Sequence, residues 1–155
     1  VILELGTELG NDEYKIKINN NEYRIRIEVD FNKARTAFIR KQDMKVIFKE
    51  LIKNLGHAFV GRENSTDNKV KISSKPASTE DFVCLEILDN GNIPEAKIGL
   101  GHRLVLDIVT RYGGRFQPLM QVSSFEDAWR DGYRKRTVIY LPRIPLPQEI
   151  AYEEE

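Results

Sequence analysis

Three polar residues in one segment have the types and the spacing that phosphate chemistry uses. Glu50, Asn54 and His57 are four and three residues apart, so on a helix they share one face. The amide oxygen of Asn54 could ligate Mg²⁺, which prefers oxygen ligands, and Glu50 could orient or deprotonate a water molecule. His57 could donate a hydrogen bond to a phosphate. A solvated polar edge of a surface helix explains the same spacing, and for this segment alone it is the commoner explanation.

Two later turns add an acidic group and a pair of glycines. The apolar run 82–88 leads directly into Asp89-Asn90-Gly91, which places a carboxylate at the end of a buried strand, where it can accept a hydrogen bond. Gly99-Leu100-Gly101 opens a helical pattern, so the backbone there can approach a ligand and the first N–H groups of the helix can bind phosphate. Taken singly, each segment is also an ordinary turn sequence.

The hydrophobic pattern indicates which elements position these residues. Apolar residues recur every three or four positions from 42 to 60, which predicts an amphipathic helix, and the same period after Gly99 predicts a second helix that ends at Gly113-Gly114. A short helical turn is expected within 124–133. Alternating or continuous apolar runs predict strands at 14–18, 23–29, 36–39, 69–74, 82–88, 115–122 and 136–141.

This order of elements predicts the fold class. Strands in antiparallel-looking pairs, with helices between them, indicate an α+β fold. We expect a two-layer sandwich in which a mixed, mostly antiparallel sheet carries the helices on one face. Pro118 predicts that its strand lies at an edge or contains a bulge.

Composition limits the class of protein. The 155 residues fit a single domain, and 24 basic residues balance 24 acidic ones, so charge gives no support for a nucleic-acid or membrane-surface partner. One cysteine, Cys84, cannot form an internal disulfide, which favours a reducing, cytoplasmic compartment. No apolar run approaches the roughly 20 residues that span a bilayer. Because the chain does not begin with Met, we expect a fragment of a larger protein.

Taken together and in order, the three segments resemble the nucleotide-binding boxes of the GHKL (Bergerat-fold) ATPases and kinases. The run 48–54 resembles the N box and 88–94 resembles the G1 box. Residues 99–114 are similar, without a gap, to the G2 box and its helix. Residues 138–142 resemble the closing strand of the catalytic domain of sensor histidine kinases. The resemblance covers about residues 20–144 and implies the Bergerat fold.

The resemblance implies an ATP- and Mg²⁺-binding catalytic domain of two-component signalling. Such a domain supplies ATP for phosphotransfer to a histidine on a separate dimerisation domain, and a response-regulator-like protein is a further implied partner. By position, Asn54 corresponds to the Mg²⁺ ligand and Asp89 to the residue that binds the adenine amino group. Glu50 corresponds to the general base of the ATP-hydrolysing members. The other positions that the resemblance assigns to nucleotide binding are His57, Gly91, Gly99, Leu100, Gly101 and His102.

The chain departs from the family pattern in ways that keep three hypotheses open. Asn92 and Ile93 follow Gly91, so the second G1 glycine is absent, and only residues 92–98 remain for an ATP lid. Arg134-Lys135 replaces a common Gly-Thr pair, and the basic run 134–136 predicts a solvated turn. Neither histidine is placed as a phosphoacceptor. The domain is therefore a kinase-type catalytic domain, a degenerate docking or regulatory module, or an ATPase that uses Glu50 as its base.

Overall fold

The computed structural model describes residues 7–10, 13–18, 21–33, 37–59, 61–62, 65–79, 81–92 and 100–143 of the chain. Within them it contains two long helices, α1 (Lys41–Ala58) and α2 (Leu100–Arg111), and the short helix α3 (Asp127–Arg130). The strands are β1 (Thr7–Gly10), β2 (Glu13–Ile18), β3 (Asn21–Asp30), β4 (Lys69–Pro76), β5 (Phe82–Asp89), β6 (Arg115–Gln121) and β7 (Lys135–Pro142). None of these helices combines the length and the apolarity that crossing a membrane requires.

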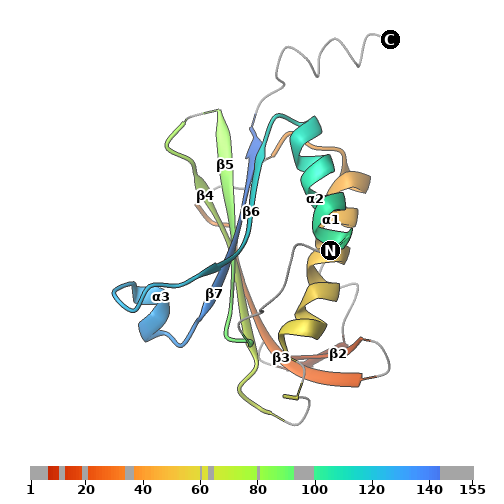
Figure 1. Ribbon diagram of the computed structural model, residues 1–155, viewed down its shortest axis with the longest axis vertical. Helices are drawn as coiled ribbons and strands as arrows, with labels where there is room; N and C mark the ends of the chain where they lie inside the picture. The colour runs from red at the N-terminus through yellow and green to blue at the C-terminus, as the bar shows by residue number, and fades with distance from the viewer. Residues whose placement is uncertain are drawn as a thin grey trace.

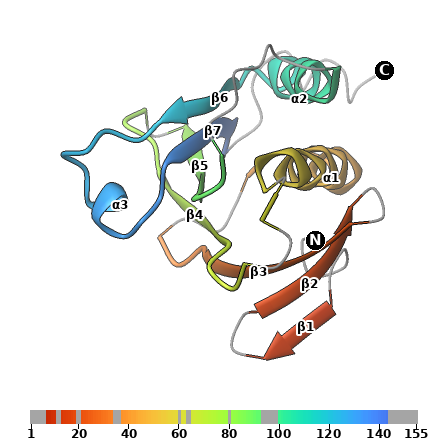
Figure 2. The same ribbon diagram turned by 60° about the horizontal axis from the view of Figure 1, so that its bottom comes forward.

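The strands form one mixed sheet in the order β1-β2-β3-β4-β5-β7-β6. Only β3 and β4 are parallel, and α1 is the crossover that joins them, as a parallel pair requires. Figure 1 shows α1 and α2 side by side on one face of the sheet, whereas α3 lies on the other side. In Figure 2, α1 lies beside the β1–β3 part of the sheet and α2 beside β6 and β7. The predicted two-layer α+β sandwich with a mostly antiparallel sheet is confirmed.

The hydrophobic core fills the space between the sheet and the two long helices. Successive side chains of a strand point to opposite faces, and in β5 and β7 the odd-numbered positions face the helices. The core residues of these strands and of the helices above them include Val83, Leu85, Ile87, Ile139, Leu141, Ile47, Leu51, Val105 and Val109. Each such aliphatic side chain contributes about 1.5–3 kcal/mol when fully buried. The same alternation directs Asp89, the last residue of β5, and Lys135, the first of β7, toward the helices.

Some sequence predictions fail locally for identifiable reasons. The strand expected at 36–39 is absent from residues 37–40, where Phe38 N makes a backbone bond to Pro142 O (2.6 Å) but no ladder forms. Leu104, which the helical period assigns to the buried side of α2, is 41% exposed. In contrast, β6 is an edge strand whose register shifts between Gln117 and Met120, so the expected effect of Pro118 is confirmed. Three consecutive asparagines at 19–21 predict a hairpin turn between the first two strands, and residues 19 and 20 lie outside the described residues.

Candidate functional site

A buried acid and a buried base meet where β5 ends and β7 begins. Asp89 and Lys135 are directly paired across the two strands. The Lys135 Nζ lies 3.4 Å from Asp89 Oδ1, and the two side chains are only 3% and 8% exposed. The same oxygen accepts a hydrogen bond from the Gly91 backbone N–H at 2.9 Å. The solvated turn expected at 134–136 is therefore wrong for Lys135, because β7 already begins there and its register turns this side chain toward the helices.

The environment of Asp89 opposes its ionisation. Burial raises the pKa of Asp89 above its ordinary 3.8, while the charge of Lys135 and the hydrogen bond from Gly91 act in the opposite direction. We consider burial the dominant effect, because 3.4 Å is a long contact for an ion pair. A carboxyl with a raised pKa in a dry site is characteristic of functional positions, although structural networks also produce it.

The raised pKa predicts how stability depends on pH. The folded state holds the Asp89 proton more tightly than the unfolded chain, so this carboxyl stabilises the fold most below pH 3.8. That contribution is lost as the pH rises through the folded-state pKa. We expect the unfolding free energy of the wild type to fall relative to that of Asp89→Asn as the pH rises above 3.8 and through the folded-state pKa, measured by denaturant titration. The exposed Asp127→Asn is the control. If the wild type instead became more stable relative to Asp89→Asn as the pH rises, Lys135 would be holding Asp89 ionised.

His102 is a third buried polar residue near this pair. It lies in the first turn of α2, is 6% exposed, and its ring meets the Phe116 ring edge-on at 5.8 Å. Burial lowers the pKa of His102 below 6.5 and the nearby charge of Lys135 lowers it further, so the ring is neutral at pH 7. Its Nδ1 is buried and has no hydrogen-bond partner among the described residues. A buried polar atom without a partner is costly, so this nitrogen is poised for a ligand or a water molecule.

The end of α1 lies directly against the Asp89 turn. The Asn92 backbone N–H donates to Ala58 O at 2.7 Å. A Cβ at Gly91 would lie 2.7 Å from Ala58 O and 2.8 Å from Ala58 Cβ, which leaves no room for a side chain. Because Asn54 precedes Ala58 by four residues, both lie on the α1 face that meets this turn. The end of α1 that follows Asn54 by one turn thus contacts the turn after Asp89.

The polar residues of α1 differ in their contacts. Asn54 is partly buried, and its Nδ2 is buried without a partner in the described part of the chain. Glu50 is 16% exposed and forms an ion pair with Lys53 at 3.5 Å. His57 belongs to α1 by its backbone, but its side chain lies outside the described residues. Of Glu50 and Asn54, the two whose side chains the structure describes, Asn54 is the one with an unsatisfied polar atom.

The start of α2 supplies backbone donors near His102. Leu100 is the first residue of α2, and Gly101 follows within the first turn, which contains no acidic residue. Free N–H groups at a helix start attract anions, and no carboxylate of that turn competes here. Gly99 and the short segment expected to form the lid lie outside the described residues, as does the side chain of Leu100.

Comparison with known proteins identifies the fold. No family model and no curated protein matches the sequence. The catalytic domain of histidine kinase ThkA superposes with a TM-score of 0.57 at 17% identity, covering 79% of this chain and 82% of that one. This chain has the fold of a histidine kinase catalytic domain. The fold resemblance predicted from the three boxes is confirmed.

Two longer structures have a similar fold. The histidine kinase domain of the blue-light activated histidine kinase EL346 of Erythrobacter litoralis has a TM-score of 0.52 and 23% identity, over 76% of this chain and 55% of that one. The Acinetobacter baumannii histidine kinase AdeS has a TM-score of 0.53 and 20% identity, over 77% and 54%. The chain therefore spans about half the length of these two structures. At such identities the similarity concerns the fold.

Sequence reasoning misses the residue that contacts Asp89. The basic run 134–136 predicts a solvated turn, yet Lys135 continues the odd-numbered, helix-facing series of Ile139 and Leu141. Strand parity was thus the signal that could have found it. Sequence reasoning also missed how the Asp89 turn is held. Asn90 Oδ1 accepts from the Lys69 backbone N–H at 2.9 Å, and Arg62 donates to the Asn90 carbonyl oxygen.

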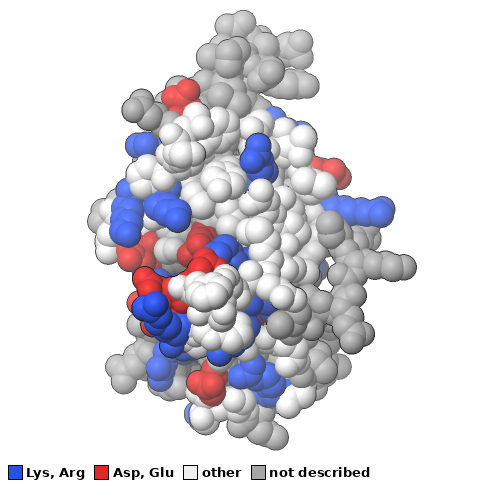
Figure 3. Space-filling view, turned by 60° about the vertical axis from the view of Figure 1, so that its left-hand side comes forward, with Lys and Arg blue, Asp and Glu red and all other residues white. Residues whose placement is uncertain are grey.

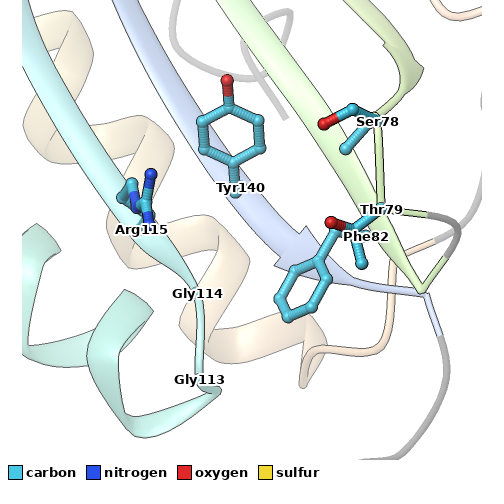
Figure 4. Close-up of a pocket in the computed structure, with 8 residues that line it drawn as sticks. Ser78, Thr79, Phe82, Gly113, Gly114, Arg115 and Tyr140 are labelled. Carbon is cyan, nitrogen blue, oxygen red and sulfur yellow. The ribbon is translucent and has the colours of Figure 1, made fainter.

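The face of the sheet opposite α1 and α2 carries two separate hollows. One has a volume of about 280 Å³ and lies between Arg115 and Tyr140 on one side and Ser78, Thr79 and Phe82 on the other (Figure 4). Tyr140 alternates with core-facing Ile139 and Leu141, so this hollow is on the far side of the sheet from Asp89.

The second hollow lies beside α3 and is lined by charged side chains of both signs (Figure 3). Arg136 is paired there with Glu86 at 2.9 Å and with Glu126 at 2.6 Å. The guanidinium of Arg136 is therefore paired with carboxylates of the protein itself. Neither hollow belongs to the Asp89 site.

Proposed function

We propose that this chain binds ATP and Mg²⁺ as the catalytic domain of a histidine kinase-like protein and supplies the phosphoryl group for transfer to a histidine on another domain. The observation that carries the proposal is the buried Asp89, which lies at a sheet end between two helices that each present an unsatisfied polar atom. Those atoms are Asn54 Nδ2 on α1 and His102 Nδ1 on α2. Ligand sites use a small number of placed polar groups to fix orientation, and these three side chains would supply them.

Each of these residues would contact a different part of the nucleotide. Asp89 would accept a hydrogen bond from the adenine amino group. The side-chain amide of Asn54 carries an oxygen beside its nitrogen, and that oxygen would hold Mg²⁺. When bound, Mg²⁺ neutralises phosphate charge and favours transfer of the terminal phosphoryl group. The backbone around Gly99, Leu100 and Gly101 would bind phosphates, with His57 and His102 nearby.

The wider role follows from the same proposal. We propose a single nucleotide-binding domain over residues 1–155, with its core at about 20–144, that belongs to a larger cytoplasmic protein. Its partners would be a dimerisation and phosphoacceptor domain or a response-regulator-like protein. A role for Glu50 as catalytic base in ATP hydrolysis has less support, because this carboxylate is paired with Lys53.

One observation favours a second candidate function, a degenerate domain that serves as a docking or regulatory module without ATP. The Lys135 ammonium already lies 3.4 Å from Asp89, where a Gly-Thr pair is common in the family. If this cation satisfied Asp89 completely, the carboxylate would have no capacity left for adenine. The two candidates therefore make opposite predictions about ATP binding.

Isothermal titration of the folded chain with Mg-ATP separates them. We expect saturable binding that Asp89→Asn weakens about tenfold or more, because the loss of a hydrogen bond to a charged group costs about 1.5–3 kcal/mol. The control is Asp127→Asn, the same chemical change at a 92% exposed side chain on α3, which should leave affinity unchanged. Absence of binding by a folded sample would remove the ATP proposal and favour the degenerate module.

A further inference from the structure

We infer that Lys135 is a second residue that contacts the nucleobase, donating a hydrogen bond to ring nitrogen N1 of adenine while Asp89 accepts from the exocyclic amino group. This inference rests on the proposed nucleotide function and extends it. A lysine ammonium has three N–H donors and no acceptor. Adenine presents the complementary pattern on one edge, because its amino donor is attached to C6 and the neighbouring ring atom, N1, is an acceptor. An acid and a base held side by side can therefore form hydrogen bonds with the amino group and with N1 at the same time.

The arrangement of the pair meets that requirement. Asp89 and Lys135 are opposite each other on hydrogen-bonded strands, and both point toward the layer of helices. Their charged atoms are 3.4 Å apart, so a donor and an acceptor stand next to each other. Register between strands fixes this spacing, which gives the pair the rigidity that a recognition site needs.

The pair retains unused hydrogen-bonding capacity. Asp89 is the described carboxylate that pairs with the Lys135 ammonium, at 3.4 Å, and an ammonium has three N–H donors to place. On Asp89, Oδ1 receives both the Gly91 N–H and Lys135. A buried ammonium with one partner at 3.4 Å is poorly satisfied, and an acceptor from a ligand would complete it.

The distribution of contacts over the two carboxylate oxygens argues against competition between Lys135 and the nucleotide. The contacts from Gly91 and Lys135 fall on Oδ1, and in this proposal Oδ2 accepts from the amino group. A base therefore need not displace the ammonium, and Lys135 can remain beside Asp89 while it donates to N1. The buried Nδ1 of His102, close enough to Lys135 for the lysine charge to affect its pKa, is a further polar atom without a described partner at the same place.

The test changes one atom of the ligand. The full chain is titrated with Mg-ATP and with the Mg complex of 1-deaza-ATP, in which a C–H group replaces N1. We expect the wild type to bind 1-deaza-ATP about tenfold more weakly, as loss of a charge-assisted hydrogen bond implies. In Lys135→Met the two ligands should bind equally. The control variant Lys75→Met changes an exposed lysine of β4 and should keep the wild-type preference.

Each of the other outcomes would contradict either the role of Lys135 or the proposed ATP function. Equal affinity of the wild type for both ligands overturns the role of Lys135 and leaves the proposed ATP function standing. Tighter ATP binding by Lys135→Met would show that the lysine competes with the nucleotide and also overturns it. Absence of binding of either ligand to a folded sample overturns the proposed function itself. If Lys135→Met does not fold, Lys135→Thr retains a hydroxyl for Asp89, and the ligand comparison in the wild type needs no variant.

Discussion

Replacing Lys135 with methionine is expected to lower the free energy of unfolding by about 3–5 kcal/mol, the usual cost of removing one partner from a buried ion pair. Methionine keeps the length of the side chain but leaves Asp89 buried without its neighbouring cation. Denaturant unfolding followed by circular dichroism measures the change. A loss below about 1 kcal/mol, the level of an exposed pair, would contradict the burial on which the site depends.

A double variant separates the buried charge from the packing around it. Asp89→Leu with Lys135→Met replaces both charges by apolar groups, and such replacements are often neutral or stabilising. We expect the double variant to recover most of the stability that Lys135→Met loses. Lys75→Met, on the opposite face of the sheet, should change stability by no more than about 0.5 kcal/mol. Additive losses in the double variant would mean that the two side chains do not interact.

Replacing Gly114 with alanine should also destabilise the fold strongly, by about 3 kcal/mol. A Cβ there would lie 2.1 Å from the carbonyl oxygen of Tyr140 and 2.9 Å from Val109 Cγ1. The oxygen belongs to the β7 backbone and cannot turn aside like a flexible side chain, so β6 and α2 must shift. Overpacking of this kind costs about 1–3 kcal/mol and occasionally more. Thermal unfolding monitored by circular dichroism measures the loss.

Gly61→Ala is the matched comparison for Gly114→Ala. Nothing lies within 4 Å of a Cβ at Gly61, but its φ of +83° makes alanine unfavourable by about 1–2 kcal/mol. The smaller loss at Gly61 would therefore report backbone conformation alone. If Gly114→Ala were no more destabilising than Gly61→Ala, the close approach of the α2–β6 connection to Tyr140 would be wrong.

Local pattern was sufficient for most of the fold. The period of α1 and the apolar run of β5 are properties of neighbouring residues, so their positions could be predicted to within a few residues. The segment 36–39 has strand-like residues, yet a strand forms only where a partner offers a ladder, and Phe38 makes a single backbone hydrogen bond to Pro142 at the end of β7. Pairing between distant segments is decided by the whole sheet, which explains this error.

The candidate site also contains residues that a short segment predicts and contacts that depend on distant segments. Asp89 could be predicted because it ends a strand and begins a turn within the same short segment. The contact with Lys135 depends on the register between β5 and β7, which no short segment contains. Gly91 is instructive in another way. The family resemblance assigns Gly91 to nucleotide binding, but the structure requires its small size for the contact with Ala58, so a glycine pattern alone does not separate packing from binding.

The most direct test of the central claim is a crystal structure of the chain grown with Mg²⁺ and a non-hydrolysable ATP analogue. The account predicts that adenine lies between α1 and α2, with its amino group at Asp89 and N1 at Lys135. Mg²⁺ should lie beside Asn54 and the phosphates at the start of α2. Nucleotide bound elsewhere, such as in the hollow beside Tyr140, or crystals without nucleotide at a saturating concentration, would contradict it.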